Sequence, residues 1–174
     1  MMPGRNQRTQ QLVLAALFTA MTAICAQIQI PLPPVPISLA LLSVLLCGAL
    51  LAPRYALYAM LGYALLGALG VPVFSGFGAG PSALFGPTGG YILGYALCAP
   101  AVALLKRRLG AGRLPLCMTL GLLVCYALGT AWFAFLSGCG AAAALSACVL
   151  PFLPGDLLKI ALAALLARRI SRAL

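Results

Sequence analysis

Long apolar runs, separated by short stretches rich in glycine, proline or basic residues, occupy most of this chain. A helix needs about 20 mostly apolar residues to cross the hydrocarbon core of a bilayer. The pattern therefore predicts an all-α membrane protein, a single domain over residues 1–174 built as a bundle of six transmembrane helices. The second predicted span is short, and we expect it to tilt or to end early. The six spans are expected at residues about 10–29, 37–53, 54–73, 88–106, 115–137 and 150–168.

Basic residues occur only in alternate connections between these spans, apart from one lysine inside the last span. They lie before the first span, between the second and third, between the fourth and fifth, and after the sixth, whereas the other connections carry no charge. Basic loops stay on the cytoplasmic side of a membrane. The alternation therefore predicts that the N- and C-termini are both cytoplasmic. The residues concerned are Arg5, Arg8, Arg54, Lys106, Arg107, Arg108, Arg113, Arg168, Arg169 and Arg172.

The composition indicates that the lipid bilayer surrounds most of the protein. Hydrophobic residues make up 64% of the chain and charged residues 7%, whereas a soluble domain carries about 25% charged residues. The net charge of +10 comes from clusters at span ends and forms no stripe on one face, which argues against a nucleic-acid partner. The arginines before the first span resemble a signal peptide, but its apolar run is long and no A-x-A cleavage site follows, which favours a retained span.

The reactive side chains of the sequence argue against catalysis and metal binding. The chain has no histidine and one acidic residue, so general acid–base chemistry has almost no participants. Its seven cysteines form no C-x-x-C motif, and no histidine could complete a metal site with them. The phosphate-binding motif G-x-x-x-x-G-K-[ST] is missing from the sequence, so the chain is not its own ATPase. We expect no catalytic residue, no metal and no cofactor.

The one acidic residue, Asp156, lies in the last predicted span, three positions before Lys159. On a helix this spacing places both side chains on one side. A charge at bilayer depth costs about 2.5–3.5 kcal/mol, and a purely structural ion pair is one explanation for keeping two of them. The functional explanation is a clamp in a pocket open to the outside. A carboxylate accepts hydrogen bonds and an ammonium donates them, which suits a ligand with N–H groups beside a carbonyl, such as a urea or amide ring.

A glycine-rich connection without charge lies between the third and fourth predicted spans, at residues about 74–88. Its glycines permit backbone conformations that other residues avoid and allow a ligand to approach closely. We expect this outer loop to act as a lid over the pocket. A flexible spacer is the alternative, although the segment is long for a simple connection.

Four stretches, in this order along the chain, together resemble the BioY family, the biotin-binding S components of energy-coupling-factor (ECF) vitamin transporters. The resemblance covers nearly the whole chain. It implies that a six-helix S component in the cell (plasma) membrane of a prokaryote captures biotin from outside. It also implies partners, namely an ECF coupling transmembrane subunit and two cytoplasmic ATPases. The stretches are QIPLPPVPISL at 29–39, GVPVF at 70–74, GPTGGY at 86–91 and PGDLLK at 154–159.

The resemblance also implies roles for individual residues. In the family, the D-x-x-K pair of the last helix contacts the ureido ring of biotin, a role that falls to Asp156 and Lys159. An A-x-x-x-A pattern in the first helix meets the coupling subunit, and Ala16 and Ala20 match it. The loop and the GPTGGY stretch correspond to the lid and the pocket wall of the family. Substrate contacts are therefore expected at Phe74, Gly86, Thr88, Gly89, Gly90 and Tyr91.

The sequence also offers candidates for the rest of the pocket and two alternative functions. Many family members have a glutamine where this chain has Ala40, which removes one polar contact near the second span. Candidates for the carboxylate end of the ligand are Tyr91, Tyr95 and Gln27. The chain could also be a solitary biotin transporter without an ATPase, or an S component for another small cyclic vitamin. Most solitary carriers contain two repeated halves, and no repeat relates residues 1–87 to 88–174.

Overall fold

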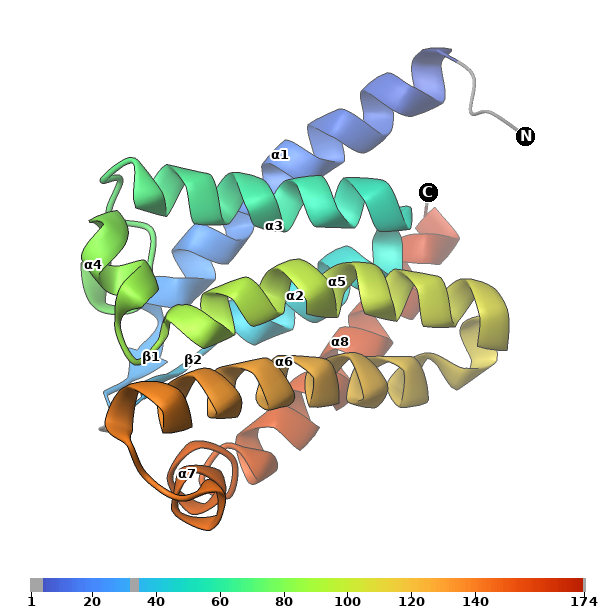
Figure 1. Ribbon diagram of the computed structural model, residues 1–174. Helices are drawn as coiled ribbons and strands as arrows, with labels where there is room; N and C mark the ends of the chain where they lie inside the picture. The colour runs from blue at the N-terminus through green and yellow to red at the C-terminus, as the bar shows by residue number, and fades with distance from the viewer. Residues whose placement is uncertain (1–4, 32–34, 174) are drawn as a thin grey trace.

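The computed structural model describes residues 5–31 and 35–173, and most of them are helical (Figure 1). Three helices among these residues are long and apolar enough to cross a membrane: Asn6–Gln27, Gly89–Leu109 and Ala111–Ser137. A pair of helices bent by 55°, Ala141–Cys148 and Leu153–Ser171, is a fourth candidate. The predicted class, a multi-helix membrane protein, is confirmed.

Within residues 5–31 and 35–173, the helices follow one another along the chain with two short strands and two 3₁₀ turns between them. The strands β1 and β2 pair antiparallel, with Gln29 opposite Ser38. They carry the chain from the first helix to the second, and residues 32–34 of the proline-rich stretch lie outside the described residues. The elements are α1 (Arg5–Gln27), β1 (Gln29–Ile30), β2 (Ile37–Ser38), α2 (Ala40–Leu50), α3 (Pro53–Ala68), η1 (Ser75–Phe77), α4 (Gly80–Phe85), α5 (Gly89–Leu109), η2 (Ala111–Arg113), α6 (Leu114–Ser137), α7 (Ala141–Cys148) and α8 (Leu153–Ala173).

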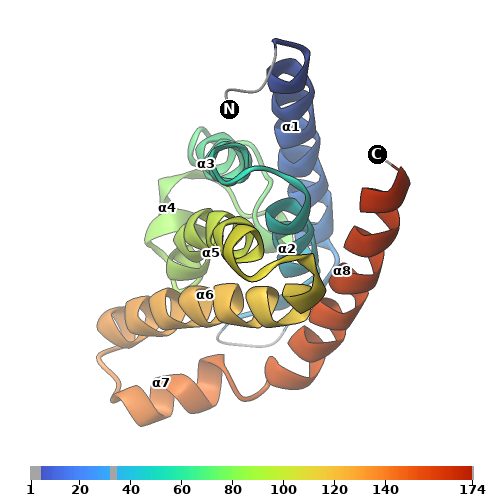
Figure 2. The same ribbon diagram turned by 90° about the vertical axis from the view of Figure 1, so that its right-hand side faces the viewer.

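Helices α2 and α3 are shorter than the spans predicted at 37–53 and 54–73, with 11 and 16 residues. The hairpin formed by β1 and β2 takes up the start of the span predicted at 37–53. Pro53 ends α2 early because a proline disfavours helical conformation in the residue before it, and Ala52 is extended. The same proline begins α3 at a position where its missing N–H costs nothing. At 1.5 Å per residue, α2 is about 16 Å long. It is largely buried among α1, α5 and α8 (Figure 2).

Two of the connections between the predicted spans contain short helices. Helix α4 lies in the loop predicted at 74–88, and α7 lies in the link before the last span. Gly138 ends α6 in a left-handed conformation, with φ 63°, which a glycine adopts without steric cost. The alanine-rich segment after it then forms α7, because alanine is the strongest helix former.

The basic segments gather at one end of the molecule. Both chain termini, the turn between α2 and α3 and the connection between α5 and α6 lie at the same end, and the hairpin and α4 lie at the other (Figure 1). Among the described basic side chains, Lys106 donates a hydrogen bond from Nζ to the carbonyl of Ala49 (2.6 Å). This bond satisfies a free carbonyl at the end of α2 and places a cation where the helix dipole favours it.

Helices α5 and α6 pack closely because glycines face the partner helix. A Cβ at Gly94 would lie 2.9 Å from Sγ of Cys125, and a Cβ at Gly90 would collide with the side chain of Trp132. Pairs of small residues four apart allow helix backbones to approach in this way. Gly90 and Gly94 form such a pair.

Candidate ligand-binding site

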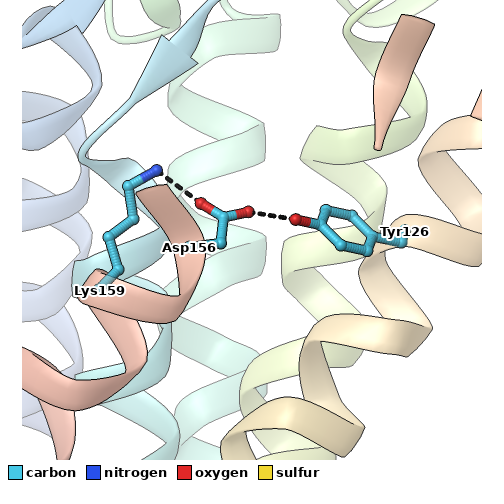
Figure 3. Close-up of polar contacts among 3 residues, drawn as sticks. All are labelled: Tyr126, Asp156 and Lys159. Atoms are coloured by element: carbon cyan, nitrogen blue, oxygen red, sulfur yellow. Dashed lines mark hydrogen bonds and ion pairs between the residues drawn. The ribbon is translucent and has the colours of Figure 1, made fainter. Parts of the chain in front are cut away.

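The buried charges lie at the start of α8. Asp156 is in its first turn, where a carboxylate interacts favourably with the positive end of the helix dipole. Lys159 follows on the same side, and its Nζ donates to Oδ1 of Asp156 at 2.7 Å (Figure 3). The two residues are 3% and 6% exposed. The prediction that they share one side of the helix is confirmed, and they pair with each other.

A second helix supplies a third member of this polar group. The hydroxyl of Tyr126, on α6, donates to Oδ2 of Asp156 at 2.5 Å, so both carboxylate oxygens have partners (Figure 3). Sequence analysis missed this residue, because it lies inside a long apolar run. A buried tyrosine usually places its hydroxyl against a polar partner, and the last span holds the only carboxylate. The need of a buried tyrosine for a polar partner could therefore have pointed to Tyr126.

The three polar groups face a cavity enclosed by α2, α3, α5, α6, α8 and the outer loop. It contains about 620 Å³ of empty space, a figure that includes space open to solvent. Its walls are mainly apolar and aromatic, with a few hydroxyls. They are formed by Val35, Pro36, Ser38, Leu41, Tyr63, Phe74, Ser75, Thr88, Tyr91, Ile92, Tyr95, Leu122, Cys125, Tyr126, Phe152, Asp156 and Lys159.

The outer loop is fixed to the end of α1 by one side-chain amide. Nε2 of Gln27 donates to the carbonyl of Phe74 (3.2 Å), and its Oε1 accepts from the backbone N–H of Phe77 (3.0 Å). Phe77 has a positive φ of 58°, which is uncommon for a bulky residue. The ring of Phe74 packs edge-on against Tyr63 with centroids 5.4 Å apart. Gln27 therefore holds the loop in a shape that keeps Phe74 in the cavity wall.

Tyr91 joins α5 to the corner between α7 and α8. Its hydroxyl donates to the carbonyl of Cys148 (3.0 Å), and its ring lies 6.4 Å from that of Phe152, measured between centroids. The ring occupies the space left by Gly129 on α6, where a Cβ would collide with it. Tyr91 thus fixes two elements that both border the cavity.

Five of the eight predicted substrate contacts border the cavity: Phe74, Thr88, Tyr91, Asp156 and Lys159. The three glycines of the GPTGGY stretch do not line it. The carbonyl of Gly86 accepts a hydrogen bond from Trp132 (3.0 Å), and Gly89 and Gly90 face α4 and α6 where a Cβ would not fit. In this structure the glycines serve packing, and a direct contact with ligand stays a prediction.

The other predicted positions lie in different surroundings. Of the candidates for the ligand carboxylate, Tyr91 and Tyr95 line the cavity and Gln27 does not. Ala40 is buried at the start of α2. Ala16 and Ala20 are exposed on α1, and the neighbouring apolar side chains Val13 and Leu17 are 63% and 60% exposed. The alanines are therefore accessible on the outer face of α1, and their contact with a partner stays a prediction.

The BioY family model matches residues 2–174 of this chain. A probable biotin transporter BioY of Pyrococcus horikoshii is 39% identical over 164 residues, which cover 94% of this chain and 97% of that protein. The biotin transporter BioY of Thermotoga maritima is 38% identical, with coverages of 94% and 96%.

A crystal structure of the S component for biotin from an ECF-type ABC transporter has a similar fold. Its TM-score is 0.89 at 26% sequence identity, and the match covers 98% of this chain and 95% of that one. The family model and the relatives match nearly the full length of this chain, and the fold is shared. The buried pair of Asp156 and Lys159 beside the cavity agrees with these matches. This chain belongs to the BioY family.

Proposed function

We propose that this protein is the S component of a biotin uptake transporter, which binds biotin from the outside and passes it to an ATP-driven ECF module. The observation that carries the proposal is the buried pair of Asp156 and Lys159 beside a mainly apolar cavity. The relatives named as biotin transporters support it. The family's activity is transport, so binding and release are the steps to be explained, with no chemical reaction on the vitamin.

In the proposed complex, the ureido ring of biotin lies against the charged pair. The carboxylate of Asp156 accepts from a ring N–H, and the ammonium of Lys159 donates to the ring carbonyl. Tyr126 keeps the carboxylate oriented during this exchange. The apolar walls cover the thioether ring. A ligand that lacks either group leaves a buried charge without its partner, which costs more than the contact itself contributes.

We place the chain in the membrane as one domain of six transmembrane helices with cytoplasmic termini. The short helices α2 and α3 count as two of the six, and the bent pair of α7 and α8 forms the last. The grouping of the basic segments at one end of the molecule supports this orientation. The cavity, the hairpin and the loop at 74–88 then face the outside, where the loop acts as a lid.

The proposed partners are an ECF coupling transmembrane subunit and two cytoplasmic ATPases. The exposed face of α1 around Ala16 and Ala20 supports the first contact, since small residues allow close approach of a second helix. Solitary transport is the competing mechanism. Proteoliposomes that contain only this chain distinguish the two, because biotin accumulation without an ATPase would contradict the proposal.

Binding of biotin to the purified protein tests the function directly. Isothermal titration calorimetry of the wild type should show tight, saturable binding, and biotin at a thousandfold above its Kd should add about 4 kcal/mol to the stability. Asp156→Asn and Lys159→Gln should each weaken binding at least tenfold, a difference of about 1.4 kcal/mol. Arg107→Gln is the matched control, since it removes an exposed charge at the opposite end of the molecule. Failure of the wild type to bind biotin would refute the proposal.

A further inference from the structure

The two charged residues that line the cavity have opposite charges, so together they carry no net charge. Asp156 and Lys159 are the only charged residues among those that line it, and they lie 2.7 Å apart. The other basic residues of the sequence belong to the segments at the far end of the molecule. Leu32, Pro33 and Pro34, outside the described residues, carry no charge. The cavity therefore offers no cation dedicated to a second anionic group.

Burial changes along the cavity wall. The charged pair and Tyr126 are buried, whereas Pro36, Ser75 and Thr88 are half-buried and come from the hairpin and the outer loop. The rim, as we call this less buried part of the wall, has hydroxyls at Ser75 and Thr88 and no charge. Hydroxyls both donate and accept hydrogen bonds, so this rim can form hydrogen bonds with an ionised or a neutral group.

The proposed function places the ureido ring at the buried pair, and this step rests on it. The other end of biotin is a carboxylate on an aliphatic chain, which then points to the rim. A carboxylate keeps its hydration there, and it avoids the desolvation cost of a buried ion. We infer that the site recognises the ring end alone and also binds amides and esters of biotin, in which the carboxylate charge is absent.

A different assignment would have Lys159 bind the ligand carboxylate. Its Nζ lies 2.7 Å from Oδ1 of Asp156, so a second carboxylate at Lys159 would also lie close to the first. Like charges at such separation repel strongly in a buried site. The attraction of Lys159 is thereby offset, which favours an uncharged ring at the pair.

Calorimetric titration with biotin, biotinamide and biotin methyl ester tests the inference. Both neutral ligands should bind to the wild type within about tenfold of the Kd of biotin. Affinity lower by more than tenfold for either one would overturn it. If biotin itself does not bind, the proposed function fails, whereas binding of biotin with rejection of the neutral ligands refutes only this inference.

The variant Lys159→Gln provides a second test that depends on ratios and not on overall affinity. If the lysine contacts the ring, the substitution weakens binding of biotin and of biotinamide by the same factor. A loss for biotin at least tenfold larger than for biotinamide would place the carboxylate at Lys159 and overturn the inference. A thermal melt of the variant establishes that it is folded before the titration.

Discussion

Removal of the Tyr126 hydroxyl tests whether the third polar group contributes to the site. Tyr126→Phe keeps the ring in its packing position and deletes only the hydrogen bond of 2.5 Å to Oδ2 of Asp156. Hydrogen bonds to charged groups contribute about 1.5–3 kcal/mol. Asp156 is 3% exposed, so water does not readily replace the lost donor. We expect the free energy of unfolding to fall by about 1.5–3 kcal/mol.

The same substitution should weaken biotin binding. A carboxylate held by Lys159 alone can turn away from the ring N–H, and we expect an increase in Kd of about tenfold, or 1.4 kcal/mol. Thermal denaturation in detergent and calorimetric titration measure the two effects. Tyr58→Phe is the control, because Tyr58 is exposed on α3.

A double-mutant cycle separates this role from general packing. In an Asp156→Asn background, Tyr126→Phe should weaken binding much less than it does in the wild type, because Tyr126 acts through the carboxylate. Wild-type stability and affinity in the single variant would refute the reasoning. Equal losses in both backgrounds would show that the hydroxyl acts independently of Asp156.

Three further predictions concern the charged pair, the loop and the outer face of α1. Lys159→Met leaves a buried carboxylate without its cation and should destabilise the protein by about 3–5 kcal/mol, whereas the double variant with Asp156→Leu and Lys159→Leu should regain the thermal stability without binding biotin. Gln27→Leu removes the hydrogen bonds that hold the outer loop; stopped-flow measurements should show biotin release faster by about tenfold, since most affinity changes appear in dissociation rates. Ala16→Trp combined with Ala20→Trp should preserve biotin binding and abolish co-purification with a coupling subunit, and unchanged co-purification would contradict the assigned contact.

Features that depend on neighbouring positions in the chain could be predicted from the sequence. Asp156 and Lys159 share a side because helical periodicity fixes it, and their rarity in an apolar chain marked them as functional candidates. The grouping of basic segments at one end followed from their alternation. These inferences needed no knowledge of how the helices pack.

Features that depend on contacts between distant segments could not be predicted. The contact of Tyr126 with Asp156 requires the rotation of α6 relative to α8, and a uniformly apolar run does not specify that rotation. The packing of the glycines at 86–90 against α4 and α6 depends on contacts between helices, and their predicted contact with a ligand stays a prediction. The lengths of α2 and α3 depended on the hairpin and on Pro53, which hydropathy alone treats as part of a span.

The hydrogen bonds of Gln27 connect the cavity to the helix that carries the exposed alanines. The amide lies at the last residue of α1 and holds the loop that contains Phe74. We expect that a docked subunit which tilts α1 also displaces this part of the cavity wall, because the hydrogen bonds of Gln27 connect the two. Docking of a subunit against Ala16 and Ala20 would then change the shape of the cavity wall at Phe74.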